Sequence, residues 1–379
     1  MPQNLPLSYI ELSEKNLAHN LTALRAEARP GTKFAFAVKG NAYGHGQNEI
    51  VRMAEPYTDY FLVNSIDELR LLRAVSEKPT FLLGYVLPPL LPEAVSLGCI
   101  FGVFSLAQFS EIEKAAAALD RKQEVHIACD ALLGREGFQE ADLPAVFAAA
   151  KTAGHVAITG MYGHFANIED TTDFSHAQKQ IDAYARMRKV AEDAGFGGLE
   201  THLSATSGLL THEKDTGTNS IVRLGVGAYG MWPSEQLKRK FTKRGLELLP
   251  VLSWKTHVAQ VKVLAPGMTI GYGLTYKTQK ETRTALVPQG YADGFPRILS
   301  NQGMVLIGGR RCPVVGRVSM NMFVVDATAV PEVAEGDEVV LIGAEGDKSI
   351  SAQEMAERSD TINYEATTRI NPLLPRIIV

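Results

Sequence analysis

The first 230 residues alternate eight times between a short apolar run and a segment with helical periodicity. The helical segments are rich in good helix formers, as in residues 66–76, 108–119 and 175–194. Strands that alternate with helices favour parallel pairing with right-handed crossovers, and eight such units can close into a (β/α)8 barrel. We therefore expect an α/β fold with this barrel, with a doubly wound open sheet as the alternative. The expected strands are residues 34–38, 60–65, 80–85, 100–105, 124–130, 157–166, 200–206 and 220–230.

The pattern changes after about residue 240. A basic stretch at residues 238–245 precedes alternating apolar runs separated by tight turns, which is typical of antiparallel strands. The length of 379 residues also exceeds what one hydrophobic core usually supports. We expect a barrel domain over residues 1–240 and a mainly β domain over residues 241–379. Residues 1–13 contain a strand-like stretch that is expected to pair with the later sheet, and residues 351–359 are the last helix candidate.

Composition bears on the partners and the compartment. A net charge of -4 with no long Lys/Arg run argues against nucleic acid or an anionic membrane and favours a small-molecule substrate. Cys99, Cys129 and Cys312 are odd in number and widely spaced, which argues against a disulfide framework and against a metal site. The start has no signal-peptide pattern, and no apolar stretch is long enough to span a membrane. We expect a cytoplasmic protein with free thiols.

Lys39 follows the apolar run in the stretch FAFAVKGNAYGHG. A lysine at the end of a strand most often lies in solvent, with its stem on apolar surface. Alternatively, it is partly desolvated, so that its neutral amine can attack a carbonyl or form a Schiff base. In a barrel, the active site lies at the end where such a strand stops.

Glycines follow the eighth expected strand, in GVGAYG. Gly225, Gly227 and Gly230 match the dinucleotide-binding pattern, but the segment runs into MWPS and opens no helix, so no such site is expected. In these barrels the loops after strands seven and eight commonly hold a phosphate. The seventh run ends in Thr206–Gly208, which adds hydroxyls, although either cluster alone is more often a turn. A phosphate cradle facing Lys39 suggests pyridoxal 5'-phosphate, bound as a Schiff base.

The stretch VKGNAYGHG (38–46) resembles the cofactor-lysine motif of alanine racemases. The resemblance extends across nearly the whole chain, in the order DALLGREGF, GHFANIED, SATSG, VRLGVGAYGMWPS, TIGYGLTY, QGYADGFPR, GRVSMNMFVVD and INYEATTR. It implies a (β/α)8 barrel followed by a β domain, in a head-to-tail homodimer whose active sites combine both chains. The implied activity is the pyridoxal-phosphate-dependent interconversion of L-alanine and D-alanine, which supplies D-alanine for peptidoglycan.

The same resemblance assigns the two bases. Lys39 carries the cofactor and is one base, and Tyr272 from the partner chain is the other. Arg223 faces the pyridine nitrogen. Because an arginine can only donate, the ring nitrogen stays unprotonated, which limits transamination and decarboxylation.

Further positions follow from the resemblance. His164 lies near the cofactor ring; a hydrogen-bonded histidine at a strand end remains its alternative interpretation. Arg135 sits beside the phenolic oxygen and the substrate carboxylate, and Met320 binds that carboxylate through its backbone. Tyr291 and Asn321 lie at the entrance. The residues implied to hold the phosphate are Tyr43, Ser207, Gly225, Val226 and Tyr364.

Several positions depart from the family pattern. Where many members have a lysine, often carboxylated, that orients the arginine, this chain has Ala128, so Arg135 needs another anchor. Asn321 replaces a usual aspartate, Thr206 a common asparagine and Gly271 a frequent serine. These changes spare both bases and Arg223.

Three other functions stay open at this point. Serine or a broader set of amino acids is the closest alternative to alanine. A pyridoxal-phosphate-dependent decarboxylase is disfavoured because it is expected to carry an acidic partner at the pyridine nitrogen. A non-catalytic carrier of the cofactor is disfavoured because such proteins resemble the barrel alone.

Overall fold

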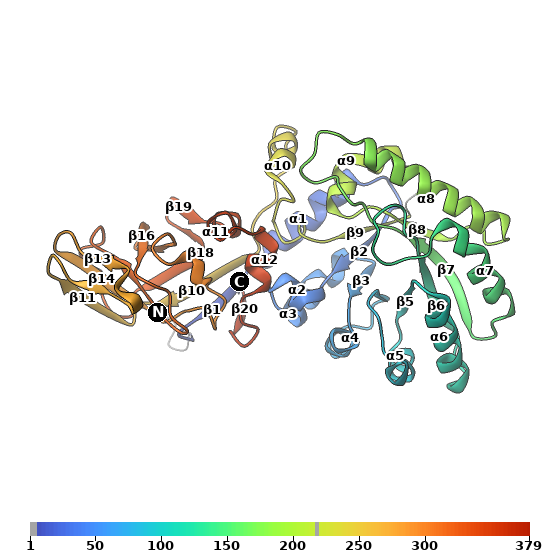
Figure 1. Cartoon of the computed structure of the whole chain (residues 1–379), viewed down its shortest axis with the longest axis horizontal. Helices are drawn as coiled ribbons and strands as arrows, with labels where there is room; N and C mark the ends of the chain where they lie inside the picture. The colour runs from blue at the N-terminus through green and yellow to red at the C-terminus, as the bar shows by residue number, and fades with distance from the viewer. Residues whose placement is uncertain (1–5, 217–219) are drawn as a thin grey trace. The chain divides into compact units, whose positions relative to one another are not determined.

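The computed structural model describes residues 6–216 and 220–379, which divide into two compact units (Figure 1). The first, here called the barrel unit, comprises residues 18–39 and 50–248. The second, here called the β unit, comprises the N-terminal residues up to Leu17, residues 40–49 and residues 249–379. Lys39 therefore lies at a point where the chain passes from one unit to the other.

The barrel unit contains one sheet of eight parallel strands in the order β8-β7-β6-β5-β4-β3-β2-β9. A bridge between Ala205 and Arg223 brings β9 beside the end of β8, so the sheet nearly closes. All eight strands predicted from the apolar runs are present, and the open sheet is excluded. The strands are β2 (Lys33–Ala37), β3 (Tyr60–Val63), β4 (Thr80–Leu82), β5 (Ile100–Val103), β6 (Gln123–Ala128), β7 (Val156–Tyr162), β8 (Glu200–His202) and β9 (Ile221–Leu224).

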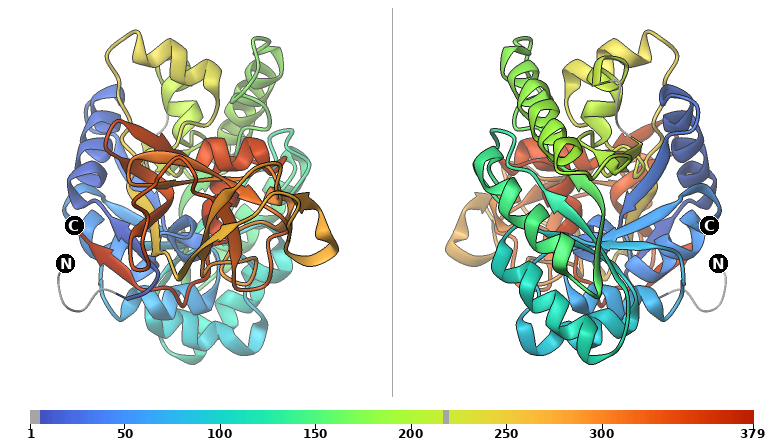
Figure 2. Two further views of the ribbon diagram at one scale, coloured as in Figure 1. Left: turned by 90° about the vertical axis from the view of Figure 1, so that its left-hand side faces the viewer. Right: turned by 90° about the vertical axis from the view of Figure 1, so that its right-hand side faces the viewer.

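Helices lie outside these strands (Figures 1 and 2). Serines begin several of them: Ser65 forms a capping box with Glu68, and the Ser105 hydroxyl accepts from the backbone of Gln108. None of the helices in residues 6–216 and 220–379 combines the length and apolar composition of a membrane span. Helices α1 (Glu14–Glu27) and α3 (Gln47–Ala54) precede β2 and β3, and the short segment α2 (Lys39–Tyr43), whose φ angles are not those of an α-helix from Gly40 on, lies between β2 and α3. The other helices up to residue 248 are α4 (Ile66–Arg73), α5 (Leu91–Leu97), α6 (Leu106–Ala118), α7 (Leu143–Thr152), α8 (Ser175–Asp193), α9 (Thr206–Thr216) and α10 (Glu235–Thr242).

The barrel core explains why the strands are nearly continuous apolar runs. Strands covered by helices on one face and by the barrel interior on the other have no solvent side. Five phenylalanines from four strands are fully buried: Phe34, Phe36, Phe61, Phe81 and Phe101. Full burial of each such side chain stabilises the unit by about 2 kcal/mol.

All eight strands end before the predicted residue, by one residue at β2 and by six at β9, and the last two show why. The seventh stops at His202, and Thr206 begins α9 instead of ending the strand. Hydroxyl side chains favour helix starts and turns over strand continuation, which explains the change. The eighth stops at Leu224, before the glycines.

The β unit is mainly β, as predicted. Its ten-stranded sheet has the main order β11-β14-β17-β16-β15-β18-β10-β1-β20, with β19 paired to β18. Strand β1 runs antiparallel to β10, with Ile10 opposite Trp254, and parallel to β20. The strands of this sheet are β1 (Tyr9–Leu12), β10 (Leu252–His257), β11 (Gln260–Leu264), β14 (Thr282–Val287), β15 (Met304–Ile307), β16 (Arg310–Val315), β17 (Phe323–Asp326), β18 (Glu338–Glu345), β19 (Lys348–Ile350) and β20 (Arg376–Ile378). Strands β12 (Thr269–Ile270) and β13 (Tyr276–Lys277) pair as a separate two-stranded sheet.

Short helices complete the β unit. The predicted helix is α11 (Ala352–Arg358), but it is not the last one, because α12 (Asn363–Thr368) follows. At six residues, α12 is too short to show a helical period in the sequence. Single 3-10 turns lie in both units: η1 (Glu55–Tyr57), η2 (Pro88–Leu90) and η3 (Glu140–Asp142) in the barrel unit, and η4 (Tyr272–Leu274) and η5 (Arg297–Leu299) in the β unit.

Candidate active site

Four of the predicted site residues lie together at the carboxyl ends of the barrel strands. Lys39 lies two residues beyond β2, Arg135 in the loop after β6, His164 two residues beyond β7 and Arg223 on β9. Lys39 and Arg135 line one cavity of about 270 Å³, together with Glu136 and residues after β3, β4 and β5. This is the end of the barrel where enzymes of this architecture hold their substrates.

The environment of Lys39 suits a neutral amine. Although the residue as a whole is exposed, desolvation around the amine lowers its pKa, and the positive charge of Arg135 lowers it further. A lysine with a lowered pKa is deprotonated more often at neutral pH, as a nucleophile or general base requires.

Arg223 is held by several acceptors beneath the mouth. Its Nη1 donates to the His202 carbonyl at 2.6 Å, and its Nη2 donates to the Gly163 carbonyl at 2.7 Å. Burial lowers the pKa of Arg223 to about 10, so the guanidinium remains protonated at neutral pH. The side chain therefore presents a fixed positive charge and can only donate.

His164 lies 3.2 Å from Arg223, measured from its Nδ1 to Nη2. Burial and then the charge of Arg223 lower the pKa of His164 to about 3. The imidazole is therefore neutral, and Nδ1 accepts from the guanidinium. The ring is thus a hydrogen-bonded partner of Arg223 at the mouth, which fits both interpretations of this histidine.

The structure offers Arg135 an anchor in place of the missing lysine at position 128. Both Nε and Nη2 of Arg135 donate to the carboxylate of Glu136, the latter at 2.8 Å. Burial raises the pKa of Glu136, but the bond to Arg135, a backbone hydrogen bond and the nearby positive charge together outweigh this effect and lower the pKa overall. A carboxylate on the next residue therefore balances the charge of Arg135.

The hydroxyls predicted to bind phosphate lie at the start of α9. Thr206 Oγ1 accepts from the backbone of Gly225 at 3.2 Å, which joins the two clusters predicted from the sequence. Ser207 Oγ donates to the carboxylate of Glu169 at 3.1 Å. The Ser207 hydroxyl thus donates to a side-chain carboxylate, and a hydroxyl at a helix start can donate in the same way to a phosphate.

A strained turn follows Lys39. Residues Gly40 to Tyr43 all have positive φ angles, between 52° and 62°. The left-handed region costs a residue other than glycine about 1–2 kcal/mol, so three such residues in a row mark a conformation fixed by its surroundings. Within the β unit, the ring of Tyr43 contacts that of Tyr364 edge to face, with centroids 6.4 Å apart. Two predicted phosphate ligands are therefore neighbours.

Val226 follows β9 beside Gly225, and four other predicted residues line a cavity of about 820 Å³ in the β unit. Tyr272 is 74% exposed there and stands between Gly271 and Gly273, whose φ angles are 73° and 70°. Arg297 and Arg317 also line this cavity, which makes it electropositive. The sequence-predicted residues in its lining are Tyr272, Tyr291, Met320 and Asn321.

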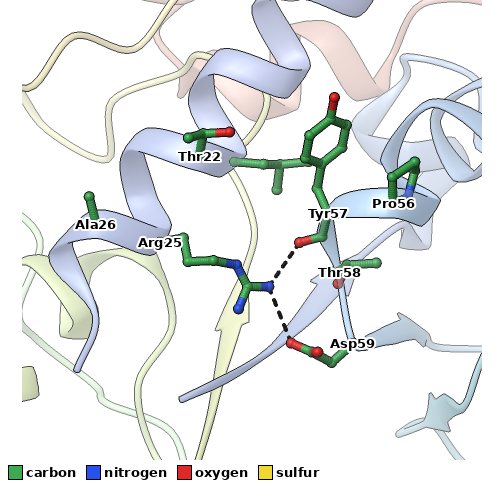
Figure 3. Close-up of a pocket in the computed structure, with 8 residues that line it drawn as sticks. Thr22, Arg25, Ala26, Pro56, Tyr57, Thr58 and Asp59 are labelled. Carbon is green, nitrogen blue, oxygen red and sulfur yellow. Dashed lines mark hydrogen bonds and ion pairs between the residues drawn. The ribbon is translucent and has the colours of Figure 1, made fainter. Parts of the chain in front are cut away.

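Another open pocket lies between α1 and the segment before β3 (Figure 3). Arg25 reaches across it and donates to the Tyr57 carbonyl at 2.9 Å and to Asp59 at 3.2 Å. This pocket is at the amino ends of the strands, opposite Lys39, and its charges are already paired. It is not a candidate active site.

Sequence reasoning missed the polar residues in the barrel below Arg223, of which His202 contacts it directly. His202, His126 and Glu200 were part of the predicted strands but carried no predicted role. Two sequence features could have identified them. EVHIACD contains a polar residue within an otherwise apolar strand, and a Glu-x-His pair in a strand places both side chains on one face.

Comparison with known proteins covers both units. Residues 12–233 match the alanine racemase N-terminal domain, and residues 251–378 match the alanine racemase C-terminal domain. Alanine racemase of Desulfosudis oleivorans is 35% identical over 382 residues, covering 98% of this chain and 96% of that protein. The structure of alanine racemase from Streptomyces lavendulae has a TM-score of 0.91 at 32% identity, covering 100% of this chain and 98% of that one. The enzyme from Clostridium difficile 630 has a TM-score of 0.92 at 30% identity, covering 100% and 97%. With both domains matched and the barrel mouth built as described, this chain belongs to the alanine racemase family of amino-acid racemases.

Proposed function

We propose that this enzyme interconverts L-alanine and D-alanine with pyridoxal 5'-phosphate, and so supplies D-alanine for peptidoglycan. The observation that carries the proposal is the position of Lys39, whose pKa is lowered at a barrel mouth that also holds Arg135, His164 and Arg223. The relatives with similar sequences and structures are named alanine racemases, which supports alanine as the substrate.

The residues present fit this cofactor. Lys39 can form the covalent link to its aldehyde, Ser207 already donates to an oxyanion, and Arg223 is a donor that keeps its protons. When bound, pyridoxal phosphate stabilises the electron pair left at the α-carbon of an amino acid. Gly225, Val226, Tyr43 and Tyr364 are the further phosphate ligands that we propose.

Racemisation requires a proton to leave one face of the α-carbon and another to arrive on the opposite face. We assign the two faces to Lys39, which acts on D-alanine, and to Tyr272, which acts on L-alanine. A lysine amine and a phenol in water are both too basic to act at neutral pH, with reference pKa values of about 10.4 and 10. Desolvation and Arg135 assist Lys39.

Tyr272 and Met320 belong to the β unit, and we propose that they serve the active site of a second copy of the chain. The exposure of both side chains, 74% and 55%, supports this assignment, since each is available to another molecule. Met320 would present its backbone to the substrate carboxylate, with Arg135 beside it and with Tyr291 and Asn321 at the entrance.

Borohydride reduction followed by peptide mapping tests the assignment of Lys39. The purified protein should be yellow, and the reduced cofactor should be found on the peptide that contains Lys39. Lys39→Ala should lose the label, whereas Lys33→Ala should keep it, because Lys33 lies at the opposite end of β2. A label on any other lysine, or on none, contradicts the proposal.

A further inference from the structure

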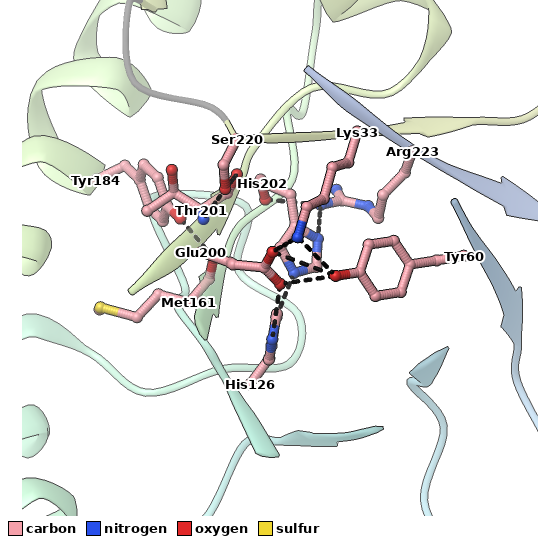
Figure 4. Close-up of polar contacts among 10 residues, drawn as sticks. All are labelled: Lys33, Tyr60, His126, Met161, Tyr184, Glu200, Thr201, His202, Ser220 and Arg223. Carbon is pink, nitrogen blue, oxygen red and sulfur yellow. Dashed lines mark hydrogen bonds and ion pairs between the residues drawn. The ribbon is translucent and has the colours of Figure 1, made fainter. Parts of the chain in front are cut away.

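A line of polar side chains crosses the barrel interior below Arg223 (Figure 4). It begins at the amino ends of the strands and ends at the mouth. His126 and His202 are completely buried along it, and Arg223 is 7% exposed. The members, from the amino end to the mouth, are Lys33 on β2, Tyr60 on β3, Glu200 on β8, His126 on β6, His202 on β8 and Arg223 on β9.

The end at Arg223 fixes the direction of the hydrogen bonds. Because arginine can only donate, His202 Nδ1, which lies 2.9 Å from Nη1, must be an acceptor. The proton of a neutral His202 is therefore on Nε2, and this atom lies 2.8 Å from Nδ1 of His126. Nδ1 of His126 then accepts, and the proton of this second ring is also on Nε2.

The negative charge of Glu200 favours the same direction. Its carboxylate can only accept, and it receives Lys33 Nζ at 2.5 Å and the Tyr60 hydroxyl at 3.2 Å. His126 Nε2 lies 3.9 Å from the carboxylate, beyond hydrogen-bond range, and forms no hydrogen bond with any residue in the described part of the chain. At this distance the carboxylate, which is nearer to the ring than its partner Lys33, favours a proton on Nε2, while burial and then the positive charge of Lys33 lower the pKa of His126.

Packing holds both rings in these orientations. A Cβ at Gly160 would lie 2.3 Å from the His126 ring, so only glycine leaves room for it. The Tyr162 ring stacks on His202, with centroids 5.1 Å apart and an interplanar angle of 20°. Burial lowers the pKa of His126 to about 3, and burial and then Arg223 lower that of His202, so both rings are neutral at neutral pH.

We propose that Glu200 is a positioning residue for Arg223: through His126 it keeps the proton of His202 on Nε2, so that Nδ1 stays free to hold the guanidinium. The inference rests on the proposed function for the role of Arg223 at the ring nitrogen, but the proton positions themselves do not. The electrostatic control of the cofactor thus begins at the opposite end of the barrel.

The test is the position of the protons in wild type and in Glu200→Gln. In the variant, Lys33 retains the amide oxygen, so the amide nitrogen faces His126 and donates to Nε2. Both histidines then shift their protons to Nδ1, and His202 no longer accepts from Arg223. ¹⁵N NMR of histidine-labelled holoenzyme should show both rings protonated at Nε2 in wild type and at Nδ1 in the variant. The kcat for alanine should fall by about tenfold, the effect of losing one charge-assisted hydrogen bond.

Two variants serve as controls. Glu200→Asp keeps the acceptor and should keep the wild-type proton positions. Tyr60→Phe removes a donor to the same carboxylate without interrupting the chain, and should also leave both rings protonated at Nε2. Wild-type His202 protonated at Nδ1, or unchanged rings in Glu200→Gln, would overturn the proposal. A protein that binds no pyridoxal phosphate would instead contradict the proposed function, because the ring protons can still be measured.

Discussion

At the scale of single residues, the barrel mouth holds two basic side chains that differ in whether they can lose their charge. Arg223 is buried and surrounded by acceptors, so it keeps its charge and its orientation. Lys39 has a lowered pKa and can change its charge. A fixed charge beside a titratable amine suits an enzyme in which one group tunes a cofactor and the other moves a proton.

The proposed second base gives a prediction at this scale. Tyr272→Phe should lower racemisation by about 10³-fold, within the usual range for loss of a general base. The variant should still exchange the α-proton of D-alanine with deuterated solvent, because Lys39 remains, and should exchange that of L-alanine far more slowly. NMR of each enantiomer in D₂O measures both rates.

Tyr291→Phe is the matched control, because Tyr291 lines the same cavity and is also exposed. It should exchange both enantiomers. Equal exchange of both enantiomers by Tyr272→Phe would mean that one base, or water, serves both faces.

At the scale of elements, the turn after β2 combines strain with close packing. Gly44 follows the left-handed residues, with a φ of +83°, and a Cβ there would lie 1.9 Å from the Thr367 carbonyl oxygen. His45 Nδ1 lies 3.1 Å from the Tyr43 carbonyl, and the Gln47 backbone donates to the Asn41 side chain at 3.0 Å. These contacts hold Tyr43 beside Tyr364.

Gly31 and Gly44 allow the energetic cost of backbone strain to be measured separately from the cost of a steric clash. Gly31 has nearly the same φ, +84°, but a Cβ added there would meet no atom within 4 Å. Gly31→Ala should cost about 1–2 kcal/mol from the left-handed backbone alone. Gly44→Ala should cost about 1–3 kcal/mol more, since the backbone must also move. Urea unfolding of the two variants measures the difference, and equal losses would contradict the packing argument.

The strands were the most predictable part of the fold. Each parallel strand is buried on both faces, so its apolar run stands out in the sequence. By contrast, the start of α9 at Thr206 depends on which acceptors its hydroxyls find, and the left-handed turn at Gly40–Tyr43 depends on contacts with residues more than 300 positions away. Lys39, His164 and Arg223 could be located from motifs, whereas Glu136 could not, because an acidic residue beside an arginine is common on surfaces.

At the scale of the whole molecule, the proposed sharing of active sites can be tested by subunit mixing. Lys39→Ala and Tyr272→Phe should each be inactive alone. After random exchange at equal amounts, about half of the dimers are mixed, and each mixed dimer has one site with both bases. Activity should therefore recover to about a quarter of wild type.

The control is a mixture of Lys39→Ala with the double variant Lys39→Ala/Tyr272→Phe, which contains no site with both bases and should stay inactive. No recovery in the first mixture, once exchange is demonstrated by mass, would show that each chain builds its own site.

Buried histidines give a second prediction for the whole chain. Burial lowers the native pKa of His45 to about 4 and those of His126 and His164 to about 3, against about 6.5 when unfolded. Below about pH 6.5 the unfolded chain therefore binds more protons, and stability falls as the pH decreases toward the native values. Each histidine contributes up to about 1.4 kcal/mol per pH unit.

Urea unfolding between about pH 7.5 and pH 5 should show this loss. His45→Asn retains a donor for the Tyr43 carbonyl. It should make the free energy of unfolding depend less steeply on pH, by the contribution of one histidine. A free energy of unfolding that does not change across this range would contradict the assignment of neutral buried rings.

Stability and activity place opposite demands on the polar side chains inside the barrel. Apolar replacements of buried polar groups often increase stability, provided that they pack well. Selection for heat resistance alone would therefore favour aliphatic side chains in place of the whole set below Arg223, because replacing Glu200 or His126 singly would leave Lys33 or His202 without its partner. Variants selected only for thermostability would then have a low kcat. A library screened only for solubility would not identify the lost polar side chains as the cause.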